Sequence, residues 1–232
     1  IGQGDSNASV NTIEFVTMRS AGVTGDFGDS INSENHLDTG ASNATRGIYN
    51  GTSSRNLSYI TIASTGNAQT FGNLQVGRYF GSAFSSTTRY CYAGGKDVSN
   101  TVVNTIGYVT IASTGNATDF GDLTQTQADC AGLSSSTRGI VAGGVTSSFT
   151  NVISYVTIAS TGNATDFGDL DEGRQFCSGT SNSTRGIIQK GDGSSSNQLQ
   201  FITIASTGNS SDFGTNYIGG QAGAVSTGHG GL

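Results

Sequence analysis

Residues 108–123 read YVTIASTGNATDFGDL, and residues 155–170 repeat these sixteen letters without a change. Close variants begin at residue 59 (YITIASTGNAQTFGNL) and residue 201 (FITIASTGNSSDFG), and a more divergent one, FVTMRSAGVTGDFGD, begins at residue 15. The five copies follow one another at a mean step of about 46 to 47 residues. Internal repetition at such a period is the signature of a repeat architecture, so this motif decides the fold.

A second block recurs in phase with the first. It reads NATRGIYNG from residue 43, STTRYCYAGG from 86, SSTRGIVAGG from 135 and NSTRGIIQKG from 182. The YVTIAS segment is rich in β-branched and aromatic residues and predicts a strand, and the Ser-Thr-Gly-Asn cluster after it predicts a turn. The short DFGDL segment predicts a second strand, and the hairpin around Ser-Thr-Arg in the second block predicts two more. Each unit therefore holds four short strands, as is typical of a propeller blade.

The sequence therefore predicts one all-β domain over residues 1–232, a closed five-bladed β-propeller with four-stranded blades. The blades are expected at residues 1–30 with 215–232, 31–74, 75–123, 124–170 and 171–214. The two ends are expected to share one blade, because residues 1–4 match the phase of residues 140–143 and residues 226–232 resemble the Ser-Thr-Arg-Gly-Ile hairpin. Closure would leave no exposed sheet edge, whereas a β-solenoid or an irregular stack of repeats remains the alternative.

Composition narrows the partners. The net charge of −6 argues against nucleic acid, which requires clustered cations, and no apolar run approaches the roughly 20 residues that insert across a bilayer. Cys91, Cys130 and Cys177 are interpreted as small buried hydrophobic residues. The two histidines, His36 and His229, lack the spacing of metal ligands, so we expect neither a metal nor another cofactor.

The order of Gly-Gly, alternating strand, turn and aromatic residue resembles the kelch repeat. The double glycine stands only at residues 94–95 and 143–144, and phenylalanine occupies the usual tryptophan position, at Phe27, Phe71, Phe120, Phe167 and Phe213. The wording TIASTGNATDFGDL followed by STRGIVAGG is similar to kelch-like repeats in structural proteins of marine tailed bacteriophages, cyanophages among them. This resemblance implies a virion protein on the particle surface, either a capsid decoration or a tail or fibre component. Its partners would be other virion proteins, or a glycan or receptor on the host surface.

One cation recurs at the same position of each repeat: Arg46, Arg89, Arg138 and Arg185, with His229 as the fifth member. In a closed ring these residues would form a crown, called here the arginine crown. It would bind an anion, an acidic glycan or an acidic partner, or else each arginine would tie its hairpin to the neighbouring blade. The repeated aspartate pairs, such as Asp119 and Asp122, could be interpreted as calcium ligands. Capping of turns by bonds from side chain to backbone is the better interpretation.

The polar residues mostly keep the repeat symmetry, whereas catalysis normally breaks it, so we expect no enzyme activity. The segment of residues 160–167 lacks the early Asp and the Trp of a sialidase Asp-box. The expected function is a non-enzymatic virion module, with a lectin-like glycan-binding propeller as the alternative and a propeller hydrolase or lyase as a weaker third. Recognition is expected in the loops that differ between repeats, at residues 75–80, 97–104, 124–129, 145–151, 171–176 and 191–198.

Overall fold

The computed structural model describes residues 10–17, 22–34, 37–51, 55–189, 191 and 198–215, with the backbone alone for residues 33, 34, 37 and 38. These residues form strands and turns, and none of them is helical. The strands build four four-stranded sheets and two two-stranded pairs. Every pairing is antiparallel, and each four-stranded sheet joins strands in the order of the chain. This architecture is compatible with a β-propeller.

We number the main sheets along the chain. Sheet 1 is the pair β1 (Val10–Phe15) and β2 (Gly25–Glu34). Sheet 2 holds β3 (Leu37–Ser42), β4 (Arg46–Gly51), β5 (Asn56–Thr61) and β6 (Gln69–Asn73). Sheet 3 holds β8 (Ser82–Ser85), β9 (Arg89–Ala93), β11 (Thr105–Thr110) and β12 (Thr118–Asp122).

Sheets 4 and 5 repeat this plan. Sheet 4 holds β13 (Ala131–Ser134), β14 (Arg138–Ala142), β15 (Val152–Thr157) and β16 (Thr165–Asp169). Sheet 5 holds β17 (Ser178–Ser181), β18 (Arg185–Gln189), β19 (Gln198–Thr203) and β20 (Ser211–Thr215). A small extra pair joins β7 (Arg78–Tyr79) to β10 (Lys96–Asp97). The prediction of four strands per repeat is thus confirmed for sheets 2 to 5, while β2 extends past the expected boundary at residue 30.

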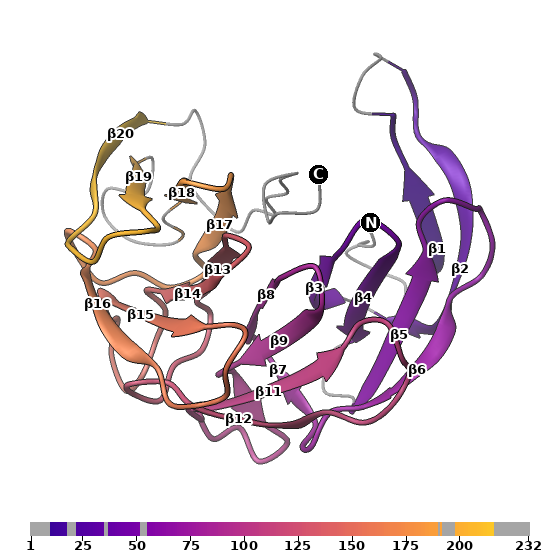
Figure 1. Cartoon of the computed structure of the whole chain (residues 1–232), viewed down its shortest axis with the longest axis horizontal. Helices are drawn as coiled ribbons and strands as arrows, with labels where there is room; N and C mark the ends of the chain where they lie inside the picture. Colours follow the sequence, from indigo (N-terminus) through magenta and orange to yellow (C-terminus); the bar gives the residue numbers. More distant parts are fainter. Residues whose placement is uncertain are drawn as a thin grey trace.

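The sheets follow one another around an arc, with β3, β8, β13 and β17 toward its centre and β6, β12, β16 and β20 at its rim (Figure 1). Four apolar clusters fill the interfaces between consecutive sheets, and each contains one of the repeat phenylalanines, Phe27, Phe71, Phe120 or Phe167. These phenylalanines are buried, at 8% exposure for Phe27 and 2% for Phe71, Phe120 and Phe167. Phe213 is 46% exposed, because no described sheet follows sheet 5.

A β-bulge places the repeat phenylalanine. In sheet 3, Ile106 pairs with Gly121 and Gly107 pairs with Asp119, which leaves Phe120 as the extra residue of β12. The same shift recurs in sheets 1, 2, 4 and 5. Bulges bend a strand and increase its twist, and here the extra residue is the phenylalanine that packs against the next sheet, as Phe120 does against Val156 and Ile158.

Serines link the inner strands to one another. Ser42, Ser85, Ser134 and Ser181 end the inner strands of sheets 2 to 5, and we call them the serine belt. The hydroxyls of Ser85, Ser134 and Ser181 donate to the carbonyl of the preceding belt serine at 3.1, 2.8 and 2.7 Å. The Ser134 hydroxyl also accepts the backbone N–H of Ser85, and the Ser181 hydroxyl accepts that of Ser134, at 3.3 Å in each case. The inner strands are thereby held at one height along the axis.

The expected junction of the two chain ends falls on residues 1–9 and 216–232, which lie outside the described residues, as does His229. Within the described residues, sheet 1 consists only of two strands, which correspond to the third and fourth strands of the other repeats.

Candidate functional site

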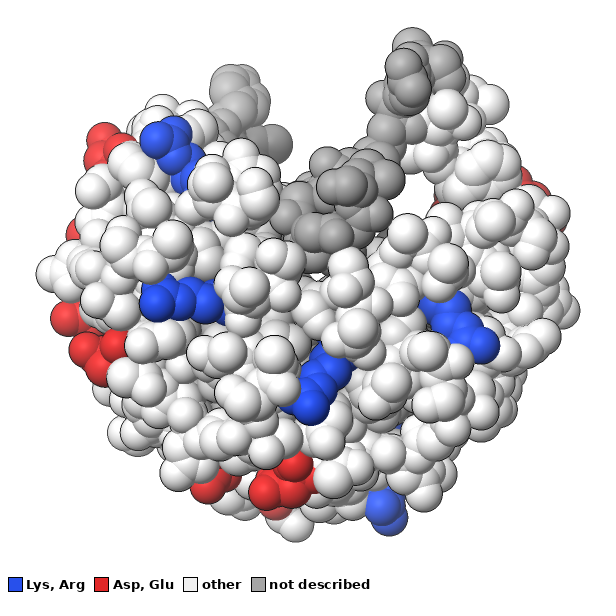
Figure 2. Space-filling view, in the orientation of Figure 1, with Lys and Arg blue, Asp and Glu red and all other residues white. Residues whose placement is uncertain are grey.

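The arginine crown lies at one end of the sheets. Its described members are the first residues of β4, β9, β14 and β18, the second strands of sheets 2 to 5. Figure 2 shows basic side chains spaced along the arc over these sheets, with acidic side chains toward the rim. Each guanidinium carbon lies over an aromatic ring of the third strand at 4.4 to 4.7 Å from the ring centroid. The pairs are Arg46 with Tyr59, Arg89 with Tyr108, Arg138 with Tyr155 and Arg185 with Phe201.

Three crown arginines also bond to the next sheet. Their Nη1 atoms donate to the carbonyls of Ile111, Ile158 and Ile204 at 2.8, 2.7 and 2.9 Å. Arg185 belongs to sheet 5, the last sheet of the described residues, and no equivalent bond is found for it among those residues. If each crown arginine ties its hairpin to the neighbouring sheet, bonds of this kind are expected. Arg46, Arg89 and Arg138 are half-buried, and Arg185 is exposed.

The aspartates act in part through their own turns. Asp26 Oδ1 accepts the N–H of Gly28 at 3.1 Å, and Asp212 Oδ1 accepts the N–H of Gly214 at 3.0 Å. This is the local capping expected from the sequence. In the part of the chain that the structure describes, no group of three His, Cys, Asp or Glu side chains is arranged to hold a metal ion.

The cysteines are free thiols in the apolar interfaces. Cys91 and Cys130 are buried and Cys177 is half-buried. Burial raises the pKa of the Cys91 and Cys130 thiols to about 12. A thiol with so high a pKa is almost entirely protonated at neutral pH and is a poor nucleophile.

The loops that differ between repeats gather at the other end of the sheets. They comprise the connections from each sheet to the next and the loops between second and third strands, and they bond to one another. The N–H of Gly95 donates to the carbonyl of Gln127 at 2.8 Å, and the N–H of Gly144 donates to that of Arg174 at 2.6 Å. Ala128 and Val145 exchange two backbone hydrogen bonds. We call this surface the variable-loop end.

Buried polar side chains support this end. Arg78, Gln127 and Arg174 occupy the same position of three successive connections and are 5%, 0% and 1% exposed. Arg78 Nη1 donates to the Thr105 carbonyl at 2.8 Å, and Gln127 Nε2 donates to the equivalent Val152 carbonyl at 3.4 Å. Arg174 forms an ion pair with Glu172. Sequence reasoning missed these residues, although the Gly-Arg pairs at residues 77–78 and 173–174 stand in the same phase of the repeat.

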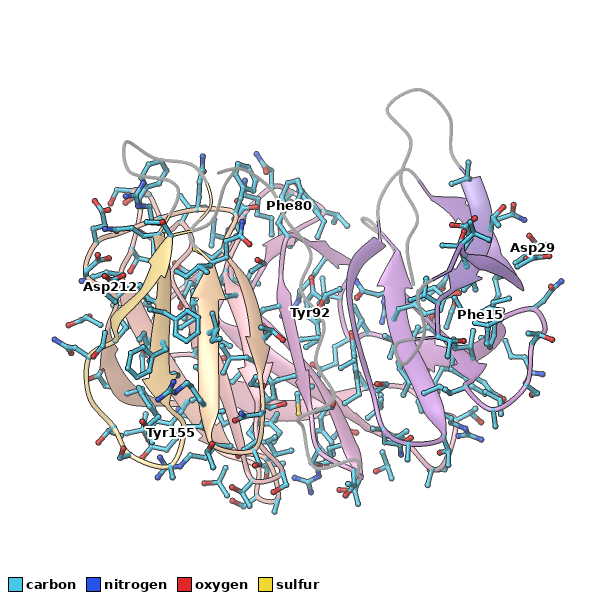
Figure 3. All side chains as sticks on the ribbon, turned by 90° about the horizontal axis from the view of Figure 1, so that it is seen from above. Phe15, Asp29, Phe80, Tyr92, Tyr155 and Asp212 are labelled. Carbon is cyan, nitrogen blue, oxygen red and sulfur yellow. The ribbon has the colours of Figure 1, made fainter. Side chains whose placement is uncertain are left out.

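An aromatic cluster lies on the variable-loop end, made of Tyr79, Phe80 and Phe176. Phe80 packs edge to face against Tyr79 at 5.0 Å and against Phe176 at 6.5 Å between ring centroids. The Nζ atom of Lys96 lies 5.5 Å from the centroid of Phe80, which is 39% exposed. In the edge-on view, Phe80 lies at one end of the sheets and Tyr155 toward the other (Figure 3).

Backbone strain marks the same place. Phe80, Asp129 and Phe176 have φ angles of 59°, 55° and 53°, which non-glycine residues seldom adopt. The N–H of Asp129 donates to the Phe80 carbonyl at 2.7 Å, so the three connections are joined where they turn into the inner strands. Asp129 is buried, and its Oδ1 atom has no hydrogen-bond partner within the described residues. Burial raises the pKa of this carboxyl, and Lys96 opposes part of the rise. Strained conformations of this kind concentrate at functional sites.

Exposed apolar side chains separate into two groups. Val76, Phe80, Val98 and Phe149 lie on the variable-loop end, at 45%, 39%, 70% and 50% exposure. A second group lies at the two open ends of the arc, in sheets 1 and 5: Phe15, Val16, Val23, Ile31 and Phe213. The remaining one, Ile62, lies in the turn of sheet 2 that faces sheet 1.

No protein-family model matches this chain, and a search of curated proteins found no similar sequence. The resemblance to kelch-like phage repeats therefore stays a prediction. None of the described residues forms a helix that would be long and apolar enough to cross a membrane.

Proposed function

We propose that this protein is a non-enzymatic structural and binding module of a bacteriophage virion, either a capsid decoration or a tail or fibre protein. Its variable-loop end would contact other virion proteins or the host surface. One observation carries the proposal: the loops that differ between repeats meet at a single end, where Val76, Phe80, Val98 and Phe149 are exposed. Exposed apolar groups on a rigid scaffold are typical of protein contact surfaces.

The scaffold of this proposal is a closed five-bladed β-propeller whose first and last segments share one blade. The support is the composition of sheet 1, which carries the repeat bulge and the buried Phe27 but has only the third and fourth strands of a repeat. The proposed ring requires two further inner strands for this blade, and the segments left to provide them in the sequence are residues 1–9 and 216–232, which lie outside the described residues. The arc of the other sheets around a common centre is consistent with that arrangement (Figure 1).

The absence of catalysis is proposed from what the repeated polar residues do. Crown arginines bond to carbonyls of the next sheet, belt serines bond to the backbone of the preceding inner strand, and turn asparagines bond to the outer strands. Each residue type thus has the same architectural bond in successive repeats, whereas a catalytic group would be expected to depart from the pattern.

A reconstruction of the intact virus particle tests the proposal. We expect density for this chain on the capsid or the tail, with the variable-loop end against a neighbouring protein or facing outward. Purified particles that lack the chain would refute a virion role.

A binding assay tests the surface separately. Fluorescently labelled chain should adhere to cultured marine cyanobacterial cells or to purified virion proteins. Val98→Glu should abolish this adhesion, while Ile62→Glu, an exposed apolar residue at the other end, should leave it intact. Equal loss in both variants, or in neither, would show that the variable-loop end is not the contact surface.

The aromatic cluster favours a second candidate, a lectin-like module that binds glycans. An exposed phenyl face can stack on the apolar face of a sugar ring, and the Lys96 ammonium beside Phe80 can donate to its hydroxyls. A glycan array separates the candidates. Specific signals that Phe80→Ala removes and Val98→Ala preserves would support the lectin, and an array without signals would exclude it for the glycans displayed.

A further inference from the structure

A recurring joint connects each sheet to the next. The turn between the third and fourth strands, Thr-Gly-Asn-Ala in most repeats and called here the repeat turn, lies on the outer strand of the preceding sheet. In the joint between sheets 3 and 4, the N–H groups of Gly162 and Ala164 donate to the carbonyls of Phe120 and Asp122, both at 2.7 Å. The joints between sheets 1 and 2, 2 and 3, and 4 and 5 contain the same two bonds at 2.7 to 2.9 Å. The repeat turn thereby covers a strand edge that would otherwise have unpaired backbone groups.

An asparagine and a glycine complete the joint. The side-chain oxygen of Asn163 accepts the N–H of Asp122 at 3.1 Å, and its counterparts Asn67, Asn116 and Asn209 accept equivalent bonds at 3.0 Å. Gly121 has a φ of 142°, and a Cβ atom there would collide with the backbone of Gly162. The glycine therefore permits the close approach of the two chains.

The outer strand of sheet 5 has this surface, and none of the described turns lies on it. Phe213 is 46% exposed and Gly214, with a φ of 137°, faces open space. Its bulge matches that of the four covered strands, and the φ of its glycine is close to the 142° to 143° of Gly28, Gly121 and Gly168. β20 is thus shaped as an acceptor for a repeat turn.

The first repeat has the matching turn at residues 22–24, and no strand of the described residues bonds to it. Val23 is 95% exposed. Val16 is 59% exposed, whereas its counterparts in the other repeats are buried at 2% to 7%. These counterparts are Ile60, Val109, Val156 and Ile202.

We propose that the outer edge of β20 is the docking surface for residues 22–24 of the same chain. The N–H of Gly22 would donate to the carbonyl of Phe213, the N–H of Thr24 would donate to that of Thr215, and Val16 would cover the Phe213 ring. This joint rests on the closed ring proposed above and identifies the atoms that close it. Val23 stands where the other turns have asparagine, so the side-chain bond to the outer strand is missing. The seam is therefore the weakest of the five joints in the ring.

Disulfide trapping tests the docking. In the four existing joints, the turn asparagine contacts the N–H of the residue that corresponds to Thr215. The double variant Val23→Cys with Thr215→Cys should therefore form a bond within one chain under mild oxidation, identified by peptide mass mapping. Asn163→Cys with Asp122→Cys, placed in an existing joint, is the positive control, and Val23→Cys alone is the negative control.

Each result has a definite meaning. An intrachain bond at a rate near that of the positive control supports the seam. Bonds between chains, seen as dimers or a ladder, would show that a second copy occupies β20 and would overturn the proposal. No bond in the test pair while the control pair forms would also overturn it. None of these results depends on binding to particles or cells, so the proposed function can fail or hold independently.

A stabilising variant provides a second test. Val23→Asn should restore the missing hydrogen bond and raise the Tm by about 2 to 4 °C. If residues 22–24 stay in solvent, as Val23 does in the described arc, the substitution should leave the Tm unchanged, and the proposal would be wrong.

Discussion

Replacing Phe167 by alanine tests the way in which consecutive sheets pack. Phe167 is 2% exposed and lies between sheets 4 and 5, in one apolar cluster with Ile202 and Ile204. Its ring meets Tyr155 edge to face, with 5.9 Å between the centroids. Burying such a ring contributes about 1.5 to 3 kcal/mol by transfer from water, and the cavity that remains after truncation raises the total cost to about 3 to 5 kcal/mol.

Equilibrium unfolding in urea, followed by circular dichroism, measures this loss. Thermal unfolding gives a second reading of the same loss. For a chain of this length each kcal/mol shifts the Tm by about 2 to 4 °C, so the Tm of the variant should fall by about 6 to 20 °C. Thr146→Ala is the control, because within the described residues the Thr146 hydroxyl bonds only to Ser148 of its own loop, donating to its carbonyl at 3.3 Å and accepting its N–H at 3.4 Å. Its effect should be well under 1 kcal/mol. Equal effects of the two substitutions would refute the assignment of Phe167 to an interface between sheets.

Four further predictions concern single residues. Arg138→Lys keeps the charge but loses the flat stacking and the bond to the next sheet, so urea unfolding should show a loss of about 1 kcal/mol. Gly121→Ala should cost about 1 to 3 kcal/mol in the same assay because of strain and collision at the joint, while Gly115→Ala, which faces open space, should cost less than about 1 kcal/mol. Burial raises the pKa of Asp129 in the folded state, so its ionisation destabilises the fold as the pH rises above the usual aspartate range. Asp129→Asn should therefore be more stable than the parent at pH 7, with a gain that shrinks toward pH 3 in parallel unfolding curves. Iodoacetamide at pH 8 should leave Cys130, whose pKa burial raises to about 12, unmodified in the folded chain and modify it in urea, and rapid reaction in the folded chain would show that the interface opens.

The repeat allowed much of the fold to be predicted from the sequence. The segments around Tyr108 and Arg138 alternate in type and are bounded by turn residues, so their strands follow from local chemistry. The burial of Phe120 and Phe167 could also be predicted, because a residue that recurs in each repeat has an equivalent neighbour in each repeat. Phe213 is exposed although it is the same residue at the same place in the repeat, because no sheet of the described residues follows sheet 5.

The candidate site was less predictable. The arginine crown was found by its spacing, but whether Arg89 faces solvent or the Ile158 carbonyl depends on the separation of two sheets, which no single repeat encodes. Phe80 and Phe176 lie 96 residues apart in the chain and meet only because their connections turn at the same end. Their positive φ angles have no sequence signal, since phenylalanine does not favour that conformation.

The serine belt bears on how the molecule would respond to force. In the edge-on view the strands run from one end of the sheets to the other (Figure 3). A pull between the two ends would load the ladders beside these strands in shear, so many hydrogen bonds would have to break together. The hydroxyls of Ser85, Ser134 and Ser181 would pass part of that load sideways into the neighbouring sheet. A module anchored at one end and attached at the other would therefore act as a stiff spacer and would extend very little before it failed.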